Sequence, residues 1–134
     1  MMQPGQKPSH RELFKKLRLA LEAIDAGRFG PVEGDLTRHV LPDMAKLGLD
    51  DINDYWDLVY ECIQLAQNDP MGCYRQPNPR KSTQHSSIKN DFLWAFVVHH
   101  SRTRLKLYFK FCLKEQKEGL YYVHIDCHES NPRH

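Results

Sequence analysis

Hydrophobic residues recur every three or four positions in the first half of the chain, a spacing that places them on one face of a helix. Three stretches show it, over residues 9–26, 35–47 and about 50–68. A capping box of Ser9 and Glu12 predicts the start of the first helix, because each side chain can satisfy a backbone N–H of the other residue. Asp35 is the expected N-cap of the second helix, in which Pro42 either bends the chain or begins a further helix.

Beyond residue 90 the hydrophobic period falls to two, which is the period of a β-strand. Strands are expected over residues 92–99, 104–114 and 120–128. The first strand is apolar without alternation, so we expect both of its faces to be buried. Short turns between consecutive strands favour antiparallel pairing. The predicted fold is therefore α+β, with three N-terminal helices packed on a C-terminal three-stranded antiparallel sheet.

The length of 134 residues suits a single domain. Residues 1–8 hold two prolines and a glycine without periodicity, and we expect a flexible tail there, followed by one domain over 9–134. No run of 18 apolar residues and no secretory signal is present, so no membrane partner is expected. Four cysteines without a C-x-x-C pair favour free thiols and a cytoplasmic location.

Charge is distributed unevenly along the chain, although the formal net charge is only +2. Residues 1–70 carry 8 Lys/Arg against 12 Asp/Glu, whereas residues 71–134 carry 11 against 5. The long polar segment 71–90 adds Arg80 and Lys81 to the basic half. Such asymmetry indicates a polyanionic partner, most often a nucleic acid, although a solvated basic face gives the same pattern.

The middle predicted strand places much of this positive charge on one of its faces. Leucines and phenylalanines at alternate positions are expected to face the core, which leaves Arg104, Lys106, Tyr108, Lys110 and Lys114 on the opposite face. Cations at this spacing can follow the phosphates of single-stranded RNA, while a tyrosine stacks on a base. The alternative is the outer face of an ordinary amphipathic strand, on which lysine is common.

The third strand brings candidate acid–base groups. In a regular strand His124, Asp126 and His128 share one face, and hairpin pairing would place the histidines beside the lysine and tyrosine row. Imidazole can act as general acid or base near neutral pH. The alternative is a pair of exposed histidines without a role. Zinc binding is disfavoured, because no His/Cys pair has the usual ligand spacing.

Five short segments lie in a characteristic order between residues 9 and 130: Leu47-Gly48-Leu49-Asp50, Tyr74-Arg75, Leu93-Trp94, Tyr108-Phe109-Lys110-Phe111 and Cys127-His128-Glu129. In this order the chain resembles the MqsR-type mRNA interferase toxins, which are relatives of the RelE-like toxins of bacterial toxin–antitoxin pairs. The resemblance implies a RelE-like fold and a metal-independent endoribonuclease without a cofactor, which cleaves mRNA and inhibits translation. It also implies a cognate antitoxin as partner, with the ribosome as a further candidate.

The resemblance assigns roles residue by residue. Arg75 occupies the position at which the family has a lysine after a tyrosine, and Tyr108 matches the family's tyrosine on the middle strand. His128 occupies the position at which the family has a lysine on the last strand. Ala95 departs from the pattern, because a catalytic glutamine is expected there.

Together these observations lead to one leading hypothesis and two alternatives. The leading hypothesis is a ribonuclease toxin with five catalytic candidates, His128, Tyr108, Lys110, His124 and Arg75. The RNA-binding candidates are Lys106, Arg104, Lys114, Arg80 and Lys81. The first alternative is a non-catalytic RNA- or DNA-binding regulator that uses the same basic strand face. The second is a protein-interaction module in which the acidic helices matter.

Overall fold

The computed structural model describes residues 7–77, 81–82 and 88–130. The elements are, in chain order, α1 (His10–Asp25), β1 (Phe29–Pro31), a π-helical segment η1 (Leu36–Val40), α2 (Leu41–Lys46), α3 (Ile52–Asn68), α4 (Pro70–Cys73), β2 (Tyr74–Arg75), β3 (Trp94–His100), β4 (Leu105–Gln116) and β5 (Gly119–Glu129). Of the helices in these ranges, none offers the apolar length that a bilayer span requires.

The sheet has five strands in the order β1-β5-β4-β3-β2. Strands β2 to β5 pair antiparallel, whereas β1 pairs parallel with β5, at Phe29 opposite Tyr122 and Pro31 opposite His124. The α+β class and the β3-β4-β5 meander agree with the sequence. The prediction of three helices on a three-stranded antiparallel sheet was wrong, because the sheet is mixed and larger and the helices are more numerous.

The missed elements are too short to show a hydrophobic period. Strand β1 has three residues and β2 has two, and each exists because a neighbouring strand supplies its hydrogen-bond partners. The second predicted helix divides at Leu41, where η1 gives way to α2 with Pro42 in its first turn. Asp35 is the N-cap residue of η1, as predicted, but its side chain makes no cap hydrogen bond.

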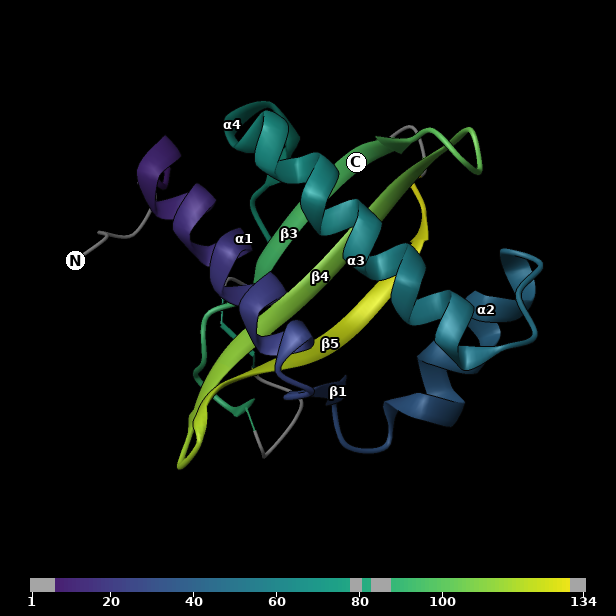
Figure 1. Cartoon of the computed structure of the whole chain (residues 1–134), viewed down its shortest axis with the longest axis horizontal. Helices are drawn as coiled ribbons and strands as arrows, with labels where there is room; N and C mark the ends of the chain where they lie inside the picture. The colour runs from purple at the N-terminus through teal and green to yellow at the C-terminus, as the bar shows by residue number, and fades with distance from the viewer. Residues whose placement is uncertain (1–6, 78–80, 83–87, 131–134) are drawn as a thin grey trace.

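Helices α1 and α3 lie across one face of the sheet (Figure 1). Their apolar faces, including Leu13 and Leu17 on α1, pack against Phe96, Phe109 and Phe111 of the sheet, and all five side chains are fully buried. The hydrogen bond from Glu12 N to Ser9 Oγ, at 3.1 Å, confirms the predicted start of α1. Apolar and polar residues alternate along β4, so its apolar side chains point to this one face, which holds the main core.

The opposite face of the sheet is apolar at one end and polar at the other. A second core covers the end near the β4–β5 hairpin, and it consists of Val32, Ile88, Leu93, Cys112, Val123 and Ile125. Burial there raises the pKa of Cys112 to about 12, so its thiol stays protonated. The polar end carries Lys106, Tyr108 and Lys110. The predicted polar face of β4 is thus interrupted at Cys112 by this second core.

A β-bulge interrupts the pairing of β4 with β5. Lys110 lies opposite Asp126 and Phe111 lies opposite His124, so Ile125 is an extra residue without a partner on β4. The extra residue reverses the faces of everything after it. His124 joins Phe111 on the helix-covered face, whereas Asp126 and His128 join Lys110 and Tyr108 on the opposite face. The prediction that His124 shares a face with Asp126 and His128 was wrong for this reason.

His124 is instead the polar centre of the main core. Its Nε2 lies 2.6 Å from the hydroxyl of Tyr55 and its Nδ1 lies 3.0 Å from the hydroxyl of Tyr122, and all three side chains are fully buried. Burial lowers the pKa of His124 to about 3, so the ring is neutral and carries one N–H. One tyrosine therefore donates to the ring and the other accepts from it, which satisfies the buried nitrogens.

This burial predicts a pH dependence of stability. Because the pKa of His124 falls from 6.5 to about 3 on folding, the unfolded chain binds the proton more readily. The stabilisation that depends on neutral His124 is fully present above roughly pH 6.5. Below that pH, the free energy of unfolding declines by up to about 1.4 kcal/mol per pH unit because of this residue. Urea unfolding at neutral pH and near pH 5 should show a steeper loss in the native protein than in His124→Gln.

The exposed His99 supplies the control, since His99→Gln should keep the native pH slope. Equal slopes for the native protein and His124→Gln would contradict the assignment of a depressed pKa to His124.

Candidate functional site

The polar end of the sheet face opposite α1 and α3 holds four side chains in two adjacent cross-strand rows. Tyr108 of β4 pairs with His128 of β5, and Lys110 pairs with Asp126. We refer to Tyr108, Lys110, Asp126 and His128 as the acid–base cluster. Of the five predicted catalytic residues, the structure brings Tyr108, Lys110 and His128 together here and places His124 on the other side of the sheet.

The rings of Tyr108 and His128 stack, with centroids 5.3 Å apart and planes inclined by 25°. His128 Nδ1 lies 3.0 Å from the carbonyl oxygen of Glu129, an acceptor, so Nδ1 carries the proton. In the neutral ring the acceptor is therefore Nε2, which lies 4.0 Å from Asp126 Oδ2. The arrangement turns the unprotonated nitrogen of His128 toward the carboxyl group of Asp126.

Asp126 is partly buried, with 21% of its side chain exposed. Burial raises the pKa of Asp126, and the positive charges of Lys110, His128 and His39 oppose that rise. Among the described residues Asp126 Oδ1 has no hydrogen-bond partner. A buried carboxyl with a raised pKa is the kind of group that can hold a proton and deliver it as a general acid.

Tyr108 completes the cluster as a hydrogen-bond donor. Burial, assisted by the negative charge of Asp126, raises the pKa of Tyr108, so the phenol remains protonated. A protonated phenol beside an ammonium group can bind an anionic oxygen. The cluster therefore combines a base, an acid, a cation and a neutral donor.

A second polar group comes from segments that the sequence did not connect with this site. Asp35 is fully buried, and its Oδ2 lies 3.1 Å from His39 Nδ1 within the η1 segment. The charges of both residues act on Asp126, which places η1 beside β5. The sequence pattern suggested only a helix cap for Asp35. A π-helix is rare and often marks a functional position, but it has no simple sequence signature.

Asp43 links α2 to the edge of β5. Strand β1 leaves β5 after His124, and Asp43 Oδ2 then accepts the backbone N–H of Cys127 at 3.4 Å. Burial raises the pKa of Asp43, and this hydrogen bond opposes the rise. A surface pocket of about 460 Å³ is lined by Asp43, Lys46, Leu47, His128 and Glu129, so the acid–base cluster borders a hollow large enough for a small polar group.

The predicted RNA-binding residues are spread more widely than the sequence suggested. Lys106 and Arg104 are exposed at the cluster's end of β4, and Arg104 has φ +60° in the turn before the strand. Lys114 lies near the hairpin, 3.1 Å from Asp91 Oδ2. The ammonium of Lys81 lies 4.9 Å from the ring centre of Phe92, and Arg80 lies outside the described residues. Lys106 and Arg104 are therefore the cations nearest the cluster along the strand.

Arg75 lies on the same cross-strand row as Lys110, since Arg75 pairs with Ala95 and Ala95 pairs with Lys110. Its Nη1 donates at 2.9 Å to the carbonyl oxygens of Gly72 and Tyr74. These two hydrogen bonds hold the Arg75 guanidinium against the neighbouring backbone. Ala95 is fully buried between the two cations and contributes no functional group.

No family model, curated protein or solved structure matches this chain. Within the described ranges, no group of three or more His, Cys, Asp or Glu side chains is arranged to hold a metal ion.

The hydrogen bond from Cys127 to Asp43 can be tested directly. Asp43→Ala removes the acceptor of a buried N–H, which typically costs about 1–3 kcal/mol of unfolding free energy. We expect faster amide hydrogen exchange at Cys127, measured by NMR. The amide of Tyr122 bonds to the carbonyl of Arg28 at 2.9 Å on the same strand and should keep its protection relative to the global unfolding rate. Equal changes at both amides would contradict a local role for Asp43.

Proposed function

We propose that this protein is a metal-independent endoribonuclease whose catalytic site is the acid–base cluster. The observation that supports the proposal is the pairing of Tyr108 with His128 and of Lys110 with Asp126 on adjacent rows of one sheet face, where all four side chains are half-buried. RNA carries its own nucleophile, the ribose 2′-hydroxyl. Cleavage therefore needs a base, an acid and positive charge near the phosphate, and the cluster offers all three.

The proposed reaction proceeds in one displacement. His128 Nε2 removes the proton from the 2′-hydroxyl, and the 2′-oxygen forms a bond to phosphorus while the bond from phosphorus to the 5′-oxygen breaks. Asp126 in its protonated form gives its proton to the departing 5′-oxygen. The products are a 2′,3′-cyclic phosphate and a 5′-hydroxyl. The imidazolium of His128 then returns a proton to Asp126, which lies 4.0 Å away.

The remaining members of the site bind charge. The Lys110 ammonium and the Tyr108 phenol stabilise the negative oxygens of the crowded phosphate. Exposed Lys106 and Arg104 extend the positive surface along β4 and can hold the adjacent phosphates of a single strand. Inhibition of translation and control by a cognate antitoxin belong to the same proposal, and the resemblance of the sequence segments supports them.

The first test is cleavage of a labelled single-stranded RNA by the purified protein in EDTA. His128→Asn should lower the cleavage rate by about 10²–10⁴-fold, because the base is lost. Lys110→Ala should lower it as well, because the phosphate loses its charge partner. The matched control is Lys117→Ala at the exposed β4–β5 turn, which should cleave at the native rate. RNA binding without cleavage would contradict the proposal and favour a non-catalytic RNA-binding protein.

A second test separates the acid from the base. A nucleoside 3′-phosphate ester with a nitrophenyl leaving group needs no proton from the enzyme, because nitrophenolate is a stable anion. Asp126→Asn should therefore lose activity on RNA by about 10²-fold or more and retain most activity on the ester. His128→Asn should lose both activities. Equal losses on both substrates in Asp126→Asn would contradict the role of Asp126 as the general acid.

A further inference from the structure

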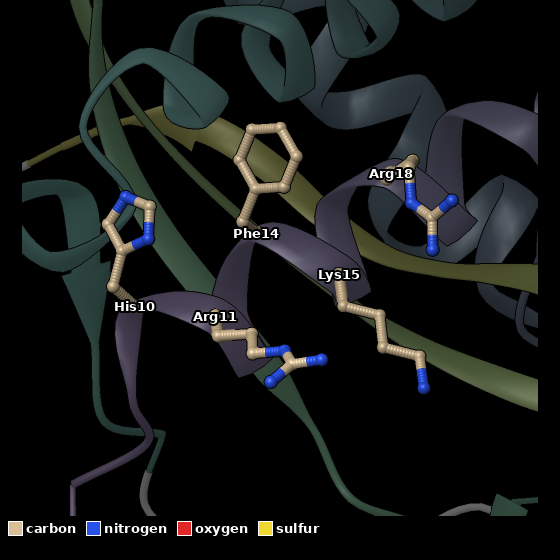
Figure 2. Close-up of a pocket in the computed structure, with 5 residues that line it drawn as sticks. All are labelled: His10, Arg11, Phe14, Lys15 and Arg18. Carbon is tan, nitrogen blue, oxygen red and sulfur yellow. The ribbon is translucent and has the colours of Figure 1, made fainter.

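A second charged surface lies on the solvent side of α1. A pocket of about 610 Å³ is lined by His10, Arg11, Phe14, Lys15 and Arg18, all from this one helix. Figure 2 shows the rings of His10 and Phe14 along one side and the long side chains of Arg11 and Lys15 along the other. Leu13 and Leu17 lie on the buried side of the helix, so these five residues belong to its outer surface.

The charges along α1 are grouped by sign. Glu12 in the first turn suits the helix dipole, but the positive residues Arg11, Lys15, Lys16 and Arg18 precede Glu22 and Asp25, and the last turn has no basic residue. The dipole favours basic side chains near the C-terminus of a helix. The dipole therefore does not account for cations in the first half of α1, whereas an anionic ligand on its outer surface would.

Partners within the chain neutralise this surface only in part. Arg18 Nη1 lies 3.7 Å from Glu22 Oε1, but both side chains are more than half exposed, and such a pair is weak in water. Lys16 points elsewhere, with its ammonium 5.5 Å from the ring centre of Trp94. Arg11 and Lys15 are exposed one helical turn apart, so their charges act on the same region of solvent.

An aromatic pair accompanies the positive charges. Phe14 is 40% exposed, and its ring stacks on that of His10 with centroids 6.2 Å apart and planes inclined by 10°. An exposed phenylalanine is costly to hydrate, and a flat ring beside cations is the usual platform for a nucleobase. An acidic peptide would use the cations but would gain little from two parallel rings.

We infer that the outer surface of α1 binds single-stranded nucleic acid, with phosphates on Arg11 and Lys15 and a base stacked on Phe14. The helical rise separates Arg11 from Lys15 by about 6 Å along the axis, a distance similar to that between successive phosphates of an extended strand. This surface is distinct from the proposed catalytic site, because α1 covers one face of the sheet and the acid–base cluster lies on the other.

The experiment measures binding of a fluorescent single-stranded DNA by anisotropy. DNA lacks the 2′-hydroxyl, so it cannot be cleaved by the proposed reaction, and the result does not depend on catalysis. The double variant Arg11→Glu/Lys15→Glu should weaken binding by at least about tenfold and reduce the slope of log K against log salt by roughly 1.4. The matched double variant Lys89→Glu/Lys117→Glu changes the net charge equally at exposed positions and should bind within about twofold of the native protein.

The stacking contact is tested by Phe14→Ala, which should weaken binding by about tenfold. Leu41 is exposed to a similar degree, at 44%, and Leu41→Ala should bind normally. Equal losses in the two double variants would overturn the inference, since binding would then follow net charge alone. So would native affinity in Phe14→Ala together with equally tight binding of a polyglutamate peptide, because the surface would then recognise acidic protein.

Discussion

The pairing of β4 with β5 and the single bulge within it determine where every polar group of the sheet lies. With Ile125 inserted, Phe111 faces His124 across one pair of rows and Lys110 faces Asp126 across the next. The same strand can therefore supply a neutral histidine to the core and a charged pair to the surface. Without the extra residue, strict alternation would place these groups on one face and leave charge in the core or histidine in solvent.

The edge of β5 creates the surroundings of the candidate site. Strand β1 pairs with β5 as far as His124 and then leaves, and Asp43 takes over by accepting the N–H of Cys127. This exchange brings η1 and α2, with Asp35 and His39, beside the polar end of the sheet. Charged residues from the first half of the chain, Asp35 and His39, thus act on Asp126 from the second half.

The two proposed nucleic-acid surfaces differ in what holds their side chains. The acid–base cluster is fixed by cross-strand pairing and by partial burial, which favours the protonated forms of Asp126 and Tyr108. The surface of α1 is exposed to solvent, with cations in the first half of a helix whose dipole does not favour them there. The first arrangement suits proton transfer, which requires fixed geometry. The second suits binding of a flexible chain, which requires charge and a stacking plane.

Periodicity determined the long elements of this protein, because each buries one face and its sequence repeats that requirement. It identified α1, α3 and the β3-β4-β5 meander. It also identified Tyr108, Lys110 and His128, the three of the five catalytic candidates that the structure brings together. It could not reveal β1 or β2, which contain too few residues to repeat. The place of His124 and the approach of Asp35 and Asp43 depended on tertiary structure alone. A bulge is one residue without a distinctive composition, and contacts between distant segments arise only when the chain packs.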